Sequence, residues 1–537
     1  MPNETTGWTT TELSLAALAL ALGATEHGGT LSPGEERLVR EGQAWPAPSD
    51  ADPHATTEAI RAGLDPLGDR LIAARPQPER RRLGQVFTPD AITAPMVRWA
   101  LEQSPARVVD AGCGSGRFAL EVARRSDAAI VAIDADPLAT LLTRAGLAAL
   151  GLTRGATVVN ADYTQTSIPE HDGRTAFIGN PPYVRHHDLT PDAKAWARLA
   201  AGRFGTRLSG LAGLHTYFFL ATALHGRPGD IGCFVTSSEW LDVNYGGAVR
   251  HLLLDGLGGR SIDIIDPAAL PFGDAATTAA VTCFEIGSEP GALLMRMVED
   301  AADLAPLSAG RPVARARLER AHRWTPLVRT APVMPEGYVE LGEICRVHRG
   351  QVTGANATWV VPAGRRTPIP DRYLFPSVTR ARELIDAGER LESTDALRRV
   401  IDLPPDLGEL DSAERAEVDA FLDSARAAGV DGGYVARNRR AWWSVGLREP
   451  APILATYMAR RPPVFVRNVA GARHINIAHG IYPREPLSER ALDRLAEALR
   501  DTVSLTLGRT YAGGLVKFEP REMERIPVPS RERLLED

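Results

Sequence analysis

The amino-acid sequence predicts an α/β protein: a mostly parallel sheet with helices on its faces, preceded by a helical extension and followed by a domain of mixed structure. From Val108 to about residue 290, short apolar runs alternate with helix-like stretches, which is typical of βα units. A glycine-rich segment stands between the first run and the first helix, as a ligand-binding loop requires. After Gly287 the sequence becomes Pro-, Arg- and Glu-rich, which indicates a separate domain. We therefore expect three parts, residues 1–80, 81–300 and 301–537.

The bulk composition is that of a globular protein and indicates no extreme class of partner. The chain has 537 residues, 44% of them hydrophobic and 24% charged, with a formal net charge of -6. An acidic total does not exclude nucleic acid, because phosphate binding depends on local clusters of cations. Nearly all cations are arginines, the exceptions being Lys194 and Lys517. Arginine suits phosphates and guanine edges, although a GC-rich coding sequence explains the same bias.

The N-terminal part is expected to be helical, and no motif in it has identifiable chemistry. Its apolar stretch from Leu13 to Leu22 is too short for a bilayer and follows Glu4 and Glu12 rather than a basic leader, so it predicts a buried helix. The four cysteines lie far apart in the sequence without CxxC spacing, which indicates neither a zinc cluster nor a disulfide framework. We expect a cytoplasmic protein with no membrane partner and no bound metal.

Seven apolar runs are the expected strands of the sheet. They are Val108–Val109, Ile130–Ile133, Thr157–Val159, Ala176–Ile178, Ile231–Thr236, Ile262–Ile265 and Ala279–Phe284. Because parallel strands end at the same edge of a sheet, polar residues that follow the first four runs are expected to meet there.

The segment Asp110-Ala-Gly-Cys-Gly-Ser-Gly116 follows the first run and precedes the helical stretch Phe118 to Arg125. Its glycines, Gly112, Gly114 and Gly116, let the backbone turn sharply and approach a ligand closely. Such loops also serve nucleotides or simple packing, so the loop alone is only moderately specific.

Acidic residues close the next two strands. The second ends in Asp134, about 20 residues beyond the loop, where a carboxylate can accept hydrogen bonds from both hydroxyls of a ribose. The third ends in Asn160-Ala-Asp162-Tyr163, where Asp162 and Tyr163 can hold an adenine ring through its amine and its face. Three strand ends with related chemistry predict an adenosine-containing cofactor.

Upstream of the loop, Gly84-Gln-Val-Phe87-Thr88-Pro89 precedes a helix that Pro89 can start. With this segment the sequence resembles Rossmann-like S-adenosylmethionine methyltransferases whose first cofactor motif lies before the glycine loop. The resemblance implies S-adenosyl-L-methionine as the cofactor, with Phe87 and Thr88 closing over its methionine part. Phe87 can also be read as a core residue.

The fourth strand runs into Asn180-Pro181-Pro182-Tyr183. Two prolines fix the loop and remove two amide donors, which leaves carbonyls as acceptors. Methylation of a planar nitrogen needs acceptors, because the lone pair must be drawn out of the ring by hydrogen bonds from the amine. The Asn180 side-chain oxygen and the Pro181 carbonyl can accept those bonds, and Tyr183 offers a flat face to a base turned out of the helix.

The arrangement resembles the N6-adenine DNA methyltransferases of restriction-modification systems, in which cofactor motifs, catalytic loop and target-recognition domain follow in this order. No strand-end Pro-Cys pair offers a nucleophile for the cytosine-carbon route. The resemblance implies that Phe272, in Leu270-Pro-Phe-Gly273, contacts the flipped base, although Phe272 can also be a core residue. It also implies duplex DNA as partner and a nucleoid-associated protein, and leaves open whether a separate restriction endonuclease or defence-complex subunits accompany it.

The C-terminal part resembles the target-recognition domain of the same family. The segment Arg346 to Asn356 is similar to its opening, and Tyr511 to Lys517 to its closing segment. The resemblance and the local arginine clusters give a set of expected DNA contacts, namely Thr353, Asn356, Arg437, Arg440 and Lys517. Any single arginine can equally be a solvated surface charge.

Two alternatives remain open from the sequence. A methyltransferase acting on a protein glutamine or on RNA makes the same demand on an Asn-Pro-Pro-Tyr loop, although the long C-terminal part favours a DNA reader. The other is a specificity subunit that binds DNA without catalysis, which the presence of Asp110, Asp134, Asp162 and Asn180 disfavours.

Overall fold

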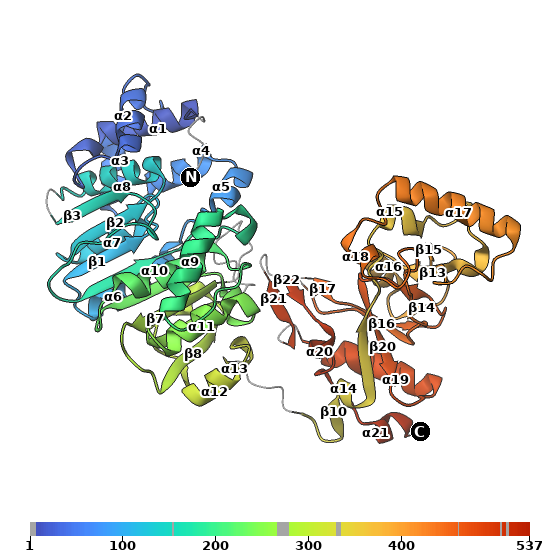
Figure 1. The fold of residues 1–537 in the computed structure, drawn as a ribbon. Coiled ribbons are helices and arrows are strands. Elements are labelled where there is room, and N and C mark those ends of the chain that lie inside the picture. Colours follow the sequence, from blue (N-terminus) through green and yellow to red (C-terminus); the bar gives the residue numbers. More distant parts are fainter. Residues whose placement is uncertain are drawn as a thin grey trace. The chain divides into compact units, whose positions relative to one another are not determined.

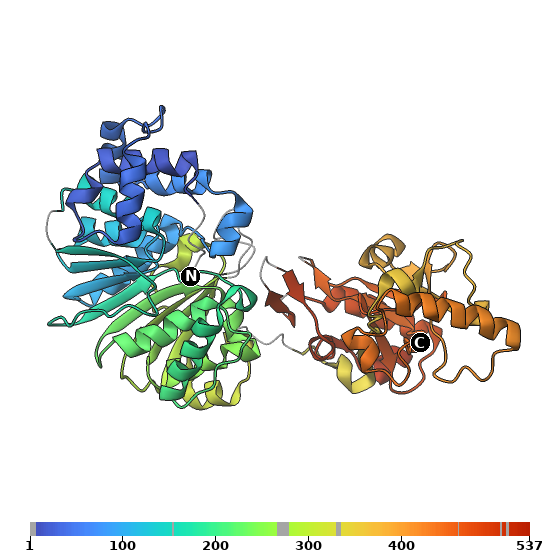
Figure 2. The ribbon, with the colours of Figure 1, turned by 45° about the horizontal axis from the view of Figure 1, so that its top comes forward.

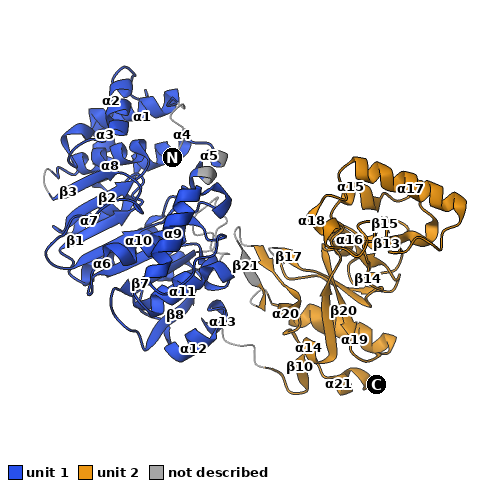
Figure 3. Cartoon of the chain, in the orientation of Figure 1, with its two compact units in different colours: residues 1–331, 512–514 blue, residues 332–511, 515–537 orange. Residues whose placement is uncertain are grey.

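The structure is a computed structural model, and it describes residues 7–152, 155–265, 279–328, 334–459, 461–504, 507–511 and 515–536. The chain divides into two compact units, Met1–Ala331 with Ala512–Gly514 and Pro332–Tyr511 with Leu515–Asp537 (Figure 3). Phe272 and its neighbours 270–273 lie outside the described residues, so the contact expected of this ring stays a prediction.

The first unit is built on a nine-stranded sheet in the order β3-β2-β1-β4-β5-β7-β6-β8-β9 (Figure 1). The first five strands of this order are parallel to one another, while β7 is antiparallel to both neighbours. The strands are β1 (Arg107–Ala111), β2 (Ala129–Asp134), β3 (Ala156–Asn160), β4 (Thr175–Gly179), β5 (Ile231–Thr236), β6 (Gly259–Ile265), β7 (Ala279–Glu285), β8 (Ala292–Val298) and β9 (Arg311–Ala314). All seven predicted strands are present, and the prediction of a mostly parallel sheet is confirmed.

Helices cover both faces of this sheet and form two apolar cores with it. One core joins the sheet to α6 (Asp90–Glu102), α7 (Arg117–Arg125) and α8 (Pro137–Ala149), and the other joins it to α9 (Pro191–Arg203), α10 (Leu214–His225) and α11 (Gly247–Leu254). From β1 the chain adds β2 and β3 on one side, and then β4 and β5 on the other side of β1, so a topological switch point lies between β1 and β4. Ligands bind at such switch points, outside the carboxyl ends of the strands. The loops after β1 and β4 are therefore adjacent.

The N-terminal extension packs on α8 as part of the first unit. It consists of α1 (Thr10–Ala21), α2 (Pro33–Gly42), α3 (Pro53–Arg61), α4 (Pro66–Ala74) and α5 (Gln77–Leu83). Figures 1 and 2 show the first helices gathered over α8, near the β3 end of the sheet. The predicted helix at Leu13 is confirmed, because α1 buries Leu13, Leu15 and Leu18 in the core that α6, α7 and α8 share.

The first unit extends beyond the boundary that the sequence suggested at residue 300. β9 pairs antiparallel with β8 at the edge of the sheet, and the unit ends at Ala331. Only Val313 of β9 is buried, so this edge strand has no apolar run by which the sequence could reveal it.

The second unit contains several small sheets. A five-stranded sheet has the order β11-β20-β16-β18-β14, and a four-stranded sheet has the order β12-β15-β13-β19. The strands used below are β11 (Cys345–Arg349), β16 (Ile453–Thr456), β18 (Phe465–Asn468), β20 (Ala478–Pro483) and β22 (Leu515–Lys517), and the helices are α17 (Ser412–Ala427), α18 (Tyr434–Arg437) and α19 (Glu489–Thr502). No helix of the described ranges has both the length and the apolar character that crossing a bilayer requires.

Candidate active site and nucleic-acid interface

The glycine loop after β1 turns directly into α7. Gly112, Gly114 and Gly116 have φ values of +76°, +55° and +94°, a region that side chains other than glycine rarely adopt. The Gly112 amide donates to the Ile133 carbonyl at 2.9 Å, and the Gly114 amide donates to the Asp134 carboxylate at 2.9 Å. The loop is thus held against the carboxyl end of β2, where the sequence placed it.

Asp110 is completely buried at the end of β1. One carboxylate oxygen, Oδ2, accepts a hydrogen bond from the Ala119 amide at 3.0 Å, while Oδ1 has no hydrogen-bond partner among the described residues. Burial raises the pKa of Asp110 to about 8, against the opposing effect of the Ala119 hydrogen bond. An enclosed carboxylate oxygen without a partner is suited to a cationic ligand.

Asp134 ends β2, as predicted, and its carboxylate already organises the loops around it. Oδ2 accepts from the Gly114 amide, and Oδ1 accepts from the Asp136 amide at 2.9 Å. Burial, and then the neighbouring charge of Asp136, raise the pKa of Asp134 to about 6. Because an ionised carboxylate has about four acceptor positions, these two bonds leave room for a hydroxyl donor.

Asp162 and Tyr163 follow β3 but differ in exposure. Asp162 is exposed, and its Oδ1 accepts from the amide and the hydroxyl of Thr164, both at 2.8 Å. Tyr163 is only 2% exposed; its ring stacks on Phe218 at 5.0 Å and its hydroxyl bonds to that of Thr222 at 2.7 Å. A ring enclosed in this way is poorly placed to cover an adenine, so burial disfavours the role predicted for Tyr163.

The segment before α6 lies beside the glycine loop. The guanidinium carbon of Arg117 lies 5.8 Å from the centre of the Phe87 ring, and a Cβ atom on Gly114 would lie 4.0 Å from that ring. The Thr88 carbonyl accepts from Arg117 Nη1 at 2.8 Å. The structure therefore brings Phe87 and Thr88 beside the glycine loop, and their contact with a cofactor stays a prediction.

The Asn180 side-chain amide is oriented by two hydrogen bonds that its nitrogen donates. Its Nδ2 donates to the Val86 carbonyl at 2.9 Å and to the Thr88 hydroxyl at 3.1 Å. The other atom of the amide, Oδ1, is buried and accepts no hydrogen bond from a described residue. This arrangement presents an acceptor and no free amide donor to whatever binds there.

The rest of the Asn180–Tyr183 loop lies between the glycine loop and the segment before α6. A Cβ atom on Gly112 would lie 3.8 Å from Pro182 Cδ and 3.9 Å from the Asn180 carbonyl oxygen. The Tyr183 amide donates to the Gly84 carbonyl at 3.0 Å, and burial raises the pKa of the Tyr183 hydroxyl well above its usual range. The Tyr183 residue is half-buried, and its hydroxyl stays protonated at neutral pH.

In the second unit, the predicted DNA contacts fall into two places. Arg439 donates to the Val352 and Thr353 carbonyls, which joins α18 and the residues after it to the segment that contains Asn356. Asn356, Arg437 and Arg440 are exposed there, and neither Arg437 nor Arg440 forms an ion pair with a described residue.

Thr353 and Lys517 differ from this exposed group. Thr353 is 2% exposed and its hydroxyl donates to the Asn356 amide oxygen, so Thr353 orients Asn356. Lys517, in β22, is paired with Glu519 and lies 5.8 Å from the centre of the Tyr457 ring.

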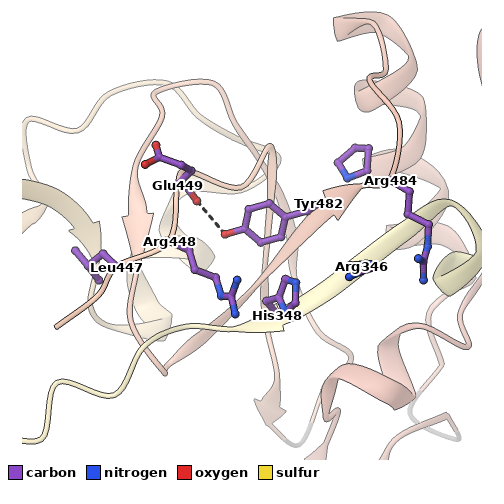
Figure 4. Close-up of a pocket in the computed structure, with 8 residues that line it drawn as sticks. Arg346, His348, Leu447, Arg448, Glu449, Tyr482 and Arg484 are labelled. Atoms are coloured by element: carbon purple, nitrogen blue, oxygen red, sulfur yellow. Dashed lines mark hydrogen bonds between the residues drawn. The ribbon is translucent and has the colours of Figure 1, made fainter. Parts of the chain in front are cut away.

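A pocket of about 610 Å³ lies elsewhere in the second unit (Figure 4). Its lining residues are Arg346, His348, Leu447, Arg448, Glu449, Tyr482, Pro483 and Arg484. The side chains of Arg346 and Arg448 are exposed and form no ion pair within the described part of the chain. Tyr482 donates its hydroxyl to the Glu449 carbonyl at 2.9 Å, which fixes its ring between β11 and the Leu447–Glu449 segment.

Sequence reasoning missed Arg117, Arg346 and Arg448 as site residues. Arg117 had one available signal: it is the first residue of a helix, where the helix dipole disfavours a cation unless a specific anion or acceptor binds it. The two pocket arginines had no comparable signal, because they are brought together from β11 and from a loop about 100 residues away.

Comparison with known proteins agrees with both units. The family described as the C-terminal domain of type II methyltransferase M.Eco57I matches residues 333–537, and a methyltransferase-domain family matches residues 108–200. The chain is 47% identical to type II methyltransferase M.XamI of Xanthomonas campestris pv. amaranthicola over 98% of this chain and 99% of that protein. It is 23% identical to type II methyltransferase M.AccI of Acinetobacter calcoaceticus over 83% of this chain and 85% of that protein.

A solved structure shows the same fold at low sequence identity. The type IIL restriction-modification enzyme MmeI, determined in complex with DNA, matches 94% of this chain and 78% of its own length with a TM-score of 0.55 and 14% identity. The near full-length match to M.XamI decides the family. The chain belongs to the type II DNA methyltransferases of restriction-modification systems.

Proposed function

We propose that this protein transfers a methyl group from S-adenosyl-L-methionine to N6 of an adenine that is turned out of duplex DNA. The observation that carries the proposal is the state of the Asn180 amide, whose nitrogen is engaged by Val86 and Thr88 while its buried oxygen stays without a partner among the described residues. An acceptor held in this way suits an incoming amine, which brings two N–H donors.

The chemistry required of the loop follows from the electronic structure of the amine. The N6 lone pair of adenine is delocalised into the ring, so the nitrogen is a poor nucleophile while it stays planar. Hydrogen bonds from the amine to Asn180 Oδ1 and to the Pro181 carbonyl hold the nitrogen near a tetrahedral geometry, with its lone pair directed at the methyl donor. The loop supplies position and electrostatic stabilisation, and no covalent intermediate is needed.

The residues around the glycine loop fit S-adenosyl-L-methionine, which supplies the methyl group when bound. Asp110 Oδ1 is an enclosed carboxyl oxygen without a partner among the described residues, and as a carboxylate it suits the cationic methionine part. Asp134 lies at the end of β2, where it can receive the ribose hydroxyls. Asp162 follows β3, and its exposed carboxylate can accept a hydrogen bond from the adenine amine of the cofactor.

The second unit is the proposed DNA reader. Its pocket offers Arg346, Arg448 and Arg484 beside Tyr482, and a second group of exposed polar side chains contains Asn356, Arg437 and Arg440. Arginines of this kind bind phosphodiester oxygens or guanine edges. Membership of a DNA methyltransferase family favours DNA over a protein glutamine or RNA as substrate, and the intact Asn180 loop favours catalysis over binding alone.

The test is transfer of labelled methyl groups to duplex DNA, followed by identification of the modified base. We expect N6-methyladenine from the intact protein and a fall in kcat of about 100-fold or more for Asn180→Ala. Asn180→Asp keeps an acceptor oxygen but loses the donors to Val86 and Thr88, so we expect it to be strongly impaired as well. No labelling by the intact protein would refute the proposed activity, and N4-methylcytosine as product would refute the assignment of the base.

A further inference from the structure

The N-terminal extension has no role in the reaction as described so far, yet two of its charged side chains reach the catalytic machinery. The first is Asp65, which precedes α4. Its Oδ1 caps that helix by accepting from the Gly68 amide at 2.8 Å. Its Oδ2 accepts from the Ser115 hydroxyl at 2.7 Å and from Arg117 Nε at 2.6 Å. One carboxylate of the extension thus binds the glycine loop and the first residue of α7.

Arg117 carries this contact on to the catalytic loop. Its Nη1 donates to the Thr88 carbonyl at 2.8 Å, and the Thr88 hydroxyl accepts from Asn180 Nδ2 at 3.1 Å. Thr88 therefore links Asp65 and Arg117 to Asn180, with Arg117 bound at its backbone carbonyl and Asn180 at its hydroxyl. The Asp65 and Arg117 side chains are only 12% and 18% exposed, so water competes weakly for these bonds.

The second charged side chain is Arg75, which follows α4 and is 4% exposed. It pairs with Glu12 of α1 at 3.0 Å and also with Asp136. The Asp136 amide donates to Asp134 Oδ1, and Asp134 Oδ2 holds the Gly114 amide. The extension therefore reaches the ribose end of the cofactor site by a path that does not involve Asp65.

The Asp65 carboxylate is closely surrounded by α4 and by the glycine loop. A Cβ atom on Gly68 would lie 2.0 Å from Asp65 Oδ2 and 2.6 Å from Ser115 Oγ, so a side chain at this position would displace the Asp65 carboxylate. Arg117 would be disfavoured at a helix N-terminus without an anion, and Asp65 supplies the anion.

We propose that the extension is a positioning element of the methyltransferase, with Asp65 as the residue that fixes Arg117 and, through Thr88, the orientation of Asn180. This inference rests on the proposed function. A purely structural ion pair would affect the stability of the protein; a positioning residue also changes cofactor binding and turnover in protein that is fully folded.

The experiment compares Asp65→Asn with Asp69→Asn in the full chain. Asparagine caps a helix about as well as aspartate, so Asp65→Asn keeps the cap of α4, while it replaces Oδ2, which accepts from Ser115 and Arg117, by an uncharged amide nitrogen. Asp69 contacts the same guanidinium at 3.1 Å, but its side chain is 73% exposed, which makes it the matched control. The measurements are Kd for S-adenosylhomocysteine by calorimetry, kcat and KM for DNA, and Tm.

For Asp65→Asn we expect kcat to fall about tenfold or more and Kd to rise about tenfold, with KM for DNA within about twofold. We expect Asp69→Asn to stay within about twofold of the intact protein in each quantity. Gly68→Ala, which displaces Asp65 without removing its charge, should lower kcat and raise Kd in the same way. A double variant of Asp65→Asn and Arg117→Gln should be no worse than the poorer single variant.

The inference fails if Asp65→Asn changes only Tm, if Asp65→Asn and Asp69→Asn behave alike, or if the effects of Asp65 and Arg117 add. These outcomes are separate from failure of the proposed function, which would show as absence of DNA methylation by the intact protein. The calorimetric comparison of the two variants decides the role of Asp65 in cofactor binding in either case.

Discussion

The Arg144 guanidinium and the Glu35 carboxylate form an ion pair, 2.8 Å between Nε and Oε1, in which neither side chain has any exposed surface. Arg144 lies in α8, which packs on the nine-stranded sheet, and Glu35 lies in α2 of the extension. The remaining donors of Arg144 go to the carbonyls of His27, Gly29, Thr30 and Val158. This pair anchors the extension on the catalytic domain.

We expect Arg144→Met to lower the free energy of unfolding by about 3–5 kcal/mol, because it leaves the Glu35 carboxylate buried without a cation. Urea-induced unfolding measures the loss. The double variant Arg144→Met with Glu35→Gln removes both charges and keeps a side-chain oxygen that can accept from the Ser32 amide at the start of α2, so it should recover part of the stability. A loss below about 1 kcal/mol in the single variant would show that the pair does not anchor the extension.

Thr88→Val tests whether the orientation of Asn180 matters for turnover. The change preserves shape but removes the oxygen that accepts from Asn180 Nδ2, so we expect kcat to fall about tenfold with little change in KM for DNA. Thr93→Val in α6 is the matched control, since the Thr93 hydroxyl is buried and has no hydrogen-bond partner among the described residues. Equal kcat values for the two variants would contradict the assigned role of Thr88.

The raised pKa of Asp110 predicts that cofactor binding is accompanied by the release of a proton. Its pKa of about 8 in the free site means that the side chain is protonated at pH 7, whereas a bound cation favours the carboxylate. Binding should then release a proton, and Kd should decrease as the pH rises from about 6 to 8 and level off above. Calorimetry in buffers of different ionisation enthalpy detects the released proton.

The same shift has the opposite effect on stability without cofactor. The folded-state pKa of Asp110 lies above its ordinary value of 3.8, so between about pH 4 and 8 the unfolded chain binds fewer protons than the folded chain. The contribution of Asp110 to the free energy of unfolding therefore becomes less favourable as the pH rises through that window. Asp110→Asn should remove the part of both pH trends that lies above about pH 6, and a pH-independent Kd in the intact protein would refute the coupling.

The pocket arginines predict how DNA affinity depends on salt. If Arg346 and Arg448 each contact one phosphate, replacing either with alanine should weaken binding to all duplexes and reduce the slope of log K against log salt by about 1. Arg415→Ala is the control, because Arg415 lies in α17 and is paired with Asp419 at 2.8 Å. Lysine at either pocket position should keep phosphate binding. Loss of binding only to the recognition sequence in the lysine variants would show base recognition instead.

The sequence sufficed for seven of the nine strands of the central sheet because these seven are short, apolar and largely buried, and the first four of them are followed by residues with recognisable chemistry. Asp110, Asp134 and Asn180 accordingly lie at adjacent strand ends. The orientation of Tyr163 was not predictable, since its hydroxyl partner, Thr222, comes from a helix about 60 residues away. The pairing of Asp65 with Arg117 was missed because it joins segments 52 residues apart; the cation at the start of α7 indicates that an anion is needed there but does not identify Asp65.

The fully buried pair of Arg144 and Glu35 also constrains how such enzymes can be recombined. A hybrid that exchanges the unit beginning at Pro332 leaves the pair and its carbonyl acceptors intact, whereas a junction between the extension and the sheet separates a cation from its only carboxylate within the described chain. We expect new specificities to be transplantable at the first junction. We expect that functional hybrids keep residues 7–328 from one parent, because α2 and α8 can be exchanged only together.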